Sequence, residues 1–94
     1  MPRFEWDEVK AQSNFKKHGV GFKEASLVFE NPLAVIFSDS EHSDFETREI
    51  LVGHTKNGIL SLVGFTELEP GIIRIISARM VTKREEVMYV KHLR

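Results

Sequence analysis

The segment REILVGHTKNGILSLVGFT, residues 48–66, decides the fold of this 94-residue chain. It contains two apolar runs rich in strand-forming residues, separated by Thr55-Lys56-Asn57-Gly58. Asn-Gly between two such runs is the strongest short-range signal for a β-hairpin. The segment therefore predicts two antiparallel strands, Arg48–His54 and Ile59–Thr66, around which the remaining elements must pack.

Three further stretches have the composition of strands. Leu33–Phe37 is continuously apolar and follows the helix-stopping pair Asn31-Pro32, and Ile72–Arg79 follows a turn at 68–71. The short stretch Arg3–Glu5 precedes the first helix signal. These patterns predict a mainly antiparallel four-stranded sheet with an additional short N-terminal strand.

Helix signals lie on both sides of the strand-rich region. Asp7 is a good N-cap for a helix that ends at His18-Gly19, and Phe22–Phe29 places three apolar residues on one helical face. Thr82-Lys83-Arg84-Glu85 is a capping box that starts a helix running towards Leu93. The order β-α-α-β-β-β-β-α predicts a single α+β domain over residues 1–94, with helices on one face of the sheet and the other face partly open.

Composition narrows the function classes. The chain has no cysteine, which excludes disulfides and thiolate chemistry and fits a cytoplasmic location. We find no apolar signal region at the N-terminus and no apolar run of membrane-spanning length. The net charge of −1 is unevenly distributed, because residues 30–70 carry −6 and residues 71–94 carry +4. A basic C-terminal quarter suits phosphate contacts, although exposed helices often carry such an imbalance without any function.

The ionisable residues favour chemistry without a metal or other cofactor. No phosphate-binding loop, nucleophile elbow or zinc motif occurs, and the acidic loop from Asp39 to Asp44 reads better as solvated than as a metal site. RNA supplies its own nucleophile, the 2′-hydroxyl group. An enzyme then needs only to accept its proton, neutralise the phosphorane and protonate the leaving 5′ oxygen. Arginine suits the neutralising task because its planar fork matches phosphate oxygens.

Several residues are candidates for these tasks. In the strand 72–79, alternation predicts Arg74 on one face and Arg79 on the other. Glu46 and Arg48 flank the start of another strand, where a plain surface ion pair is the alternative reading. His18 ends the first helix, where it can also serve as a capping cation.

The chain resembles the BrnT family of ribonuclease toxins from bacterial type II toxin–antitoxin pairs. The resemblance rests on Phe4-Glu5-Trp6-Asp7, Asn14, Lys17-His18-Gly19-Val20, Phe22, Glu24-Ala25, Phe29, Glu46, Arg48, Gly53, Arg74-Ile75-Ile76-Ser77-Ala78-Arg79, Arg84-Glu85 and Tyr89. It departs from the family at Lys23, where glutamate is usual, and at Met80-Val81. Neither change removes a candidate catalytic group.

The resemblance implies a compact fold like that of RelE-type toxins, RNA cleavage and growth arrest. It also implies neutralisation by an antitoxin of the BrnA kind, which carries a ribbon-helix-helix DNA-binding part, in an assembly of two toxins and two antitoxins. DNA would then be contacted only through the antitoxin.

We therefore expect a metal-independent endoribonuclease. Its expected catalytic residues are Arg48, Arg79, Glu46 and His18, and its expected RNA-binding residues are Arg74, Arg84, Tyr89 and Lys17. The alternative is a non-catalytic module that acts only by binding an antitoxin-like partner, and growth arrest on expression alone would separate the two.

Overall fold

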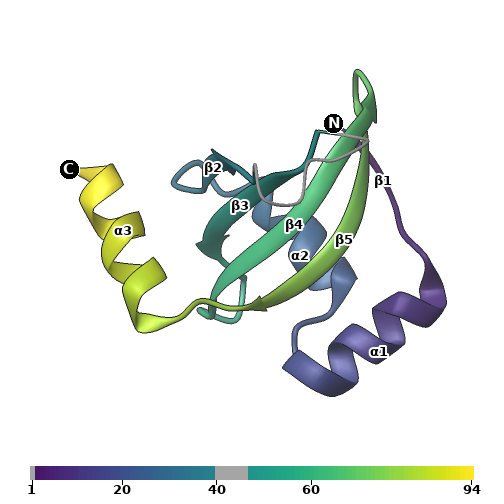
Figure 1. Cartoon of the computed structure of the whole chain (residues 1–94), viewed down its shortest axis with the longest axis horizontal. Coiled ribbons are helices and arrows are strands. Elements are labelled where there is room, and N and C mark those ends of the chain that lie inside the picture. Colours follow the sequence, from purple (N-terminus) through teal and green to yellow (C-terminus); the bar gives the residue numbers. More distant parts are fainter. Residues whose placement is uncertain (1, 40–46) are drawn as a thin grey trace.

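The computed structural model describes residues 2–39 and 47–94, in which a single five-stranded sheet carries three helices (Figure 1). The strand order in the sheet is β1-β5-β4-β3-β2. The elements are β1 (Arg3–Glu5), α1 (Glu8–His18), α2 (Phe22–Val28), β2 (Val35–Ser38), β3 (Glu49–His54), β4 (Leu60–Glu69), β5 (Ile72–Met80) and α3 (Lys83–Leu93). The α+β class and the order of elements are confirmed. The short N-terminal strand joins the sheet as a fifth strand, parallel to β5.

The helix caps and the turn of the central hairpin form where expected, whereas β4 extends to Glu69, beyond the predicted end at Thr66 and into the predicted turn at 68–71. Asp7 accepts a hydrogen bond from the Lys10 backbone N–H at 3.1 Å, and Gly19 takes the left-handed conformation at φ 74°. The capping box at the start of α3 is present, and Gly58 has φ 81° in the β3–β4 turn. β2 begins at Val35 rather than Leu33, because Asn31 accepts the backbone N–H groups of Leu33 and Ala34 in a turn.

The two faces of the sheet are covered unequally. Residues of α1 and α2 pack with Leu51, Val63 and Ile75 in the main core. On the opposite face, a smaller core joins Tyr89 of α3 to Val52 and Leu62. The expectation that all helices lie on one face was therefore wrong for α3, which covers part of the second face (Figure 1). Within the described ranges, no helix combines the length and apolar content needed to cross a membrane.

A β-bulge at Ile76 changes which residues of β5 share a face. Gly64 of β4 pairs with Ser77, but the next residue, Phe65, pairs with Ile75, so Ile76 is an extra residue in β5. Paired residues of antiparallel strands lie on the same face, and a single extra residue inverts the alternation beyond it. Ile75 therefore faces the main core together with Ala78.

This bulge overturns the predicted separation of the two arginines. Thr66 pairs with Arg74 and Leu62 pairs with Arg79, and both partners belong to the α3 side of β4. Arg74 and Arg79 consequently lie on one face of the sheet, the face that α3 only partly covers. Strict alternation across Ile72–Arg79 gave the wrong answer because it assumed an unbroken strand.

Candidate active site

A cavity of about 410 Å³ opens on the α3 side of the sheet and brings two of the predicted catalytic residues together. Arg48 and Arg79 both line it, accompanied by Asp39, Ser77 and Glu85. The lining also contains the carboxylates of Asp39, Glu49 and Glu85, so its charge is mixed, and the two guanidinium groups are its cationic donors suited to a phosphate.

Strand pairing explains how the two arginines converge. Arg48 lies two residues before Ile50, which faces the α3 side, and the backbone N–H of Asp39 donates to the Arg48 carbonyl at 3.0 Å. Asp39 is therefore the cross-strand neighbour of Arg48, directly beyond the last residue pair of the β2–β3 ladder. Arg79 reaches the same face from β5 because of the bulge.

Gly64 lines the cavity that Arg48 and Arg79 share, and its lack of a side chain keeps that space open. A Cβ atom at this position would lie 2.6 Å from the Ser77 Oγ, which is closer than real Cβ contacts allow. Glycine thus leaves room for the Ser77 side chain and for the hollow above it.

Arg79 is oriented by the first turn of α3. Its two terminal nitrogens each donate to one Glu85 carboxylate oxygen at 2.8 Å, and the first also donates to the Met80 carbonyl at 3.1 Å. These bonds hold the pKa of the Glu85 carboxyl at about 2, below its ordinary value of 4.5, and raise the pKa of Arg79. Both groups are therefore charged at neutral pH.

The ion pair orients Arg79 without saturating it. Guanidinium carries five N–H donors, and three are engaged by partners within the described ranges. These three hydrogen bonds leave two of its N–H donors unengaged. Glu85 itself accepts the Thr82 backbone N–H at 2.8 Å, so the capping box of α3 and the position of Arg79 depend on one carboxylate.

Asn14 fixes β5 from the other side. β1 pairs with β5 from Ile72 to Arg74, so the Ala78 backbone has no strand partner on that edge among residues 2–39 and 47–94. The Asn14 amide replaces the missing strand: its Nδ2 donates to the Ala78 carbonyl at 2.8 Å, and its Oδ1 accepts the Ala78 N–H at 3.2 Å. Helix α1 thereby holds the residue next to Arg79.

Three of the four predicted RNA-binding residues, Arg74, Arg84 and Tyr89, lie outside the lining of this cavity. Arg74 is exposed on the same sheet face as Arg79, outside the cavity lining, and Arg84 is exposed in the first turn of α3. Tyr89 is 2% exposed, and its hydroxyl donates to the Leu33 carbonyl at 3.0 Å. In this conformation Tyr89 anchors α3 to the sheet instead of presenting its ring to RNA.

Two predicted proton-transfer groups are not brought to this cavity by the described part of the chain. His18, with its neighbour Lys17, ends α1, which packs against the opposite face of the sheet. Glu46 lies outside the described residues, as do the acidic-loop residues Glu41, His42 and Asp44. The polar side chains of the lining that were not selected from the sequence as site residues are Asp39, Glu49, Ser77 and Glu85. From the sequence, Glu85 was identified as part of the capping box and of the family resemblance, without a role in the site.

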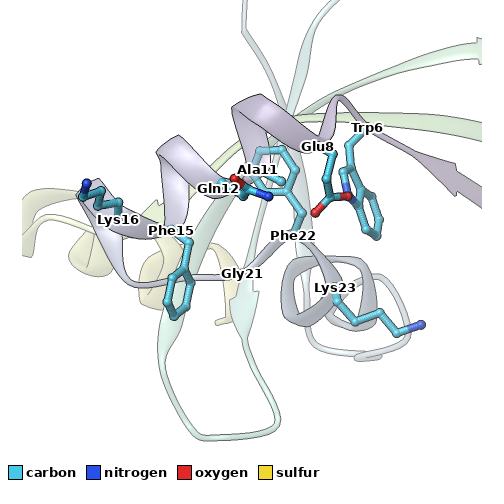
Figure 2. A pocket seen from close by; sticks show the side chains of 9 residues that line it. All are labelled: Trp6, Glu8, Ala11, Gln12, Phe15, Lys16, Gly21, Phe22 and Lys23. Carbon is cyan, nitrogen blue, oxygen red and sulfur yellow. The ribbon is translucent and has the colours of Figure 1, made fainter.

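A second hollow, of about 590 Å³, lies between α1 and the start of α2 (Figure 2). Trp6, Phe22 and Phe15 are spaced along it, with Lys16 and Lys23 at opposite ends. Trp6 donates to the Glu8 carboxylate at 3.2 Å. This hollow contains none of the residues expected to act on RNA, so the arginine-lined cavity is the stronger candidate for chemistry.

The chain is similar to known proteins over most of its length. Residues 6–85 match the family described as the ribonuclease toxin, BrnT, of type II toxin-antitoxin systems. The 1.1 Å crystal structure of the Brucella abortus ribonuclease toxin BrnT superposes with a TM-score of 0.69 at 30% sequence identity. That alignment covers 88% of this chain and 100% of the Brucella chain. No curated protein sequence gives a significant match.

Proposed function

The chain belongs to the BrnT family of ribonuclease toxins of type II toxin–antitoxin systems, and from this premise we propose that it is an endoribonuclease that needs no metal ion. The observation that carries the proposal is the convergence of Arg48 and Arg79 on one cavity. Two fixed positive charges provide the electrostatic stabilisation that a phosphoryl-transfer transition state requires.

In the proposed reaction the 2′-hydroxyl oxygen attacks the adjacent phosphorus while the bond from phosphorus to the 5′ oxygen breaks. The 2′-hydroxyl proton goes to a base, and the departing 5′ oxygen takes a proton from an acid. The products are a 2′,3′-cyclic phosphate and a 5′-hydroxyl end. Arg48 and Arg79 neutralise the extra negative charge on the phosphorane oxygens, and Glu85 holds Arg79 in place for this task.

The proton acceptor is proposed to be a carboxylate. Asp39 is the candidate among the described residues, because it lines the cavity and lies opposite Arg48. Glu46 and His18 stay predictions from the sequence. Asp39→Asn, Glu46→Gln and His18→Gln variants separate the three, since only loss of the true base should remove the acidic limb of the pH–rate profile, where the rate rises as the base loses its proton.

The proposed partner is a BrnA-like antitoxin with a ribbon-helix-helix part, in an assembly of two toxins and two antitoxins. The toxin itself would contact DNA only through that partner. Support for an antitoxin comes from the family. The antitoxin type, the stoichiometry and action in the cytoplasm are our proposal.

Cleavage of a defined RNA in excess chelator tests the proposal. We expect cleavage to continue and to yield 2′,3′-cyclic phosphate ends, and a 2′-deoxy substitution at the cut site should abolish it. Arg48→Ala and Arg79→Ala should each lower kcat by about 10²–10³-fold, the usual effect of removing one stabilising donor. Arg94→Ala, at an exposed position in the last residue, is the matched control. Loss of activity in chelator, or full activity in the double variant, would contradict the mechanism.

A further inference from the structure

A smaller apolar hollow adjoins the arginine-lined cavity. It has a volume of about 280 Å³, and its walls are Phe37, Ile50, Val52 and Leu62 from the sheet and Met88 from α3. Ile50, Leu62 and Glu85 line both spaces, so the two are adjacent. The small core beneath α3 therefore does not close over the sheet and leaves an opening beside Arg79.

The shape and chemistry of this hollow suit a flat, mostly apolar group. Its walls are hydrocarbon and one aromatic ring, and its polar lining comes from Ser38 and Glu85. Met88 is 55% exposed, so one wall is a flexible side chain that a ligand can displace. The volume lies just below the usual range of ligand pockets, which matches a single ring system better than an inserted helix.

We propose that this hollow binds a nucleobase of the nucleotide next to the scissile phosphate. The inference rests on the proposed function, because it takes the phosphate to lie between Arg48 and Arg79. In an RNA strand the bases adjoining a phosphate are attached through the sugars on either side of it. A phosphate held in the first space thus places one of them beside the second, where an apolar floor replaces water on its faces. The hollow would then set which base is preferred at the cut.

Short oligonucleotides with a single ribose at the cut site test this assignment. Each carries one of the four bases or an abasic residue on the 5′ or the 3′ side of the cleavable linkage. For the wild-type protein we expect the abasic residue on one side, and not on the other, to raise KM roughly tenfold, as loss of one stacked base does. Met88→Ala should remove most of that difference while kcat changes little. Val90→Ala is the control, because Val90 is 43% exposed on the same helix and outside the hollow.

The outcomes separate this inference from the proposed function. Equal KM values for all base and abasic substrates, with cleavage intact, would overturn the base site and leave the ribonuclease proposal standing. Binding of an uncleavable all-deoxy oligonucleotide gives a second measurement that does not depend on catalysis. It should show the same one-sided abasic penalty, reduced by Met88→Ala. If Met88→Ala weakens inhibition by the antitoxin and leaves both RNA measurements unchanged, the hollow is a protein-binding site and the inference is wrong.

Discussion

The Glu85 carboxylate has two structural roles. It completes the capping box at the start of α3, and it pairs with both terminal nitrogens of Arg79. Glu85→Gln keeps the shape and one acceptor oxygen but removes the charge. We expect it to lower the free energy of unfolding at pH 7 by about 1 kcal/mol, a value reduced from that of a buried pair because both side chains are partly exposed. Glu86→Gln should change it by less than about 0.5 kcal/mol, because Lys83–Glu86 is a surface pair.

The same pair predicts a pH dependence. The folded-state pKa of Glu85 is about 2, below its ordinary value of 4.5, so its charged form stabilises the folded protein. That contribution is complete above pH 4.5 and is lost as the pH falls towards 2. The stability difference between wild type and Glu85→Gln should therefore be constant from pH 7 to 5 and shrink below 4.5, as measured by urea unfolding at each pH. A difference that grows on acidification would contradict the assignment.

Tyr89 separates a packing role from an RNA-binding role. Tyr89→Phe removes only the hydroxyl that donates to the Leu33 carbonyl. We expect a loss of about 1 kcal/mol in unfolding free energy, the usual contribution of one hydrogen bond, with KM for RNA unchanged at a temperature where both proteins are folded. A large rise in KM without loss of stability would restore the RNA-binding role expected from the sequence.

At the level of elements, Asn14 links α1 to β5, because its side-chain amide makes the hydrogen bonds to Ala78 that a neighbouring strand would otherwise make. Asn14→Ala removes the amide that pairs with the Ala78 N–H and carbonyl and also donates to the Val20 carbonyl at 3.2 Å. We expect a loss of about 2–4 kcal/mol, because partly buried backbone groups are left without partners. Gln12→Ala, exposed on the same helix, should cost less than about 0.5 kcal/mol by urea unfolding. Equal effects of the two would mean that the edge of β5 does not need Asn14.

Local sequence patterns predicted the ends of the helices and the hairpin turn, but they did not predict the bulge in β5. Helix caps and the Asn57-Gly58 turn were predictable because each depends on residues within about four positions of one another. The bulge at Ile76 was not, because it depends on which residue of β4 faces β5 and on the space that Gly64 leaves for Ser77. The residue types within β5 do not indicate the bulge.

At the scale of the whole molecule, two basic residues that were given the same role from the sequence lie on different faces of the sheet. Arg74 and Lys17 were both expected to bind RNA, but Arg74 lies on the face of Arg48 and Arg79, whereas Lys17 belongs to α1 on the opposite face. We expect Arg74→Ala to weaken RNA binding and to reduce the slope of log K against log salt by about 0.7, the value for one phosphate contact on a single strand. Lys17→Ala should leave the slope unchanged. Equal effects in a salt titration would mean that RNA contacts both faces.

The sequence alone determined the type and order of the elements and their caps, because such information is carried by residue type and short spacing. It also gave the arginines as candidates for phosphate contact, which stays a prediction. Only the tertiary structure decided which arginines share a cavity, that Glu85 orients Arg79, and that Tyr89 is buried. These facts depend on strand register, and one extra residue in β5 is enough to move Arg79 to the other face of the sheet.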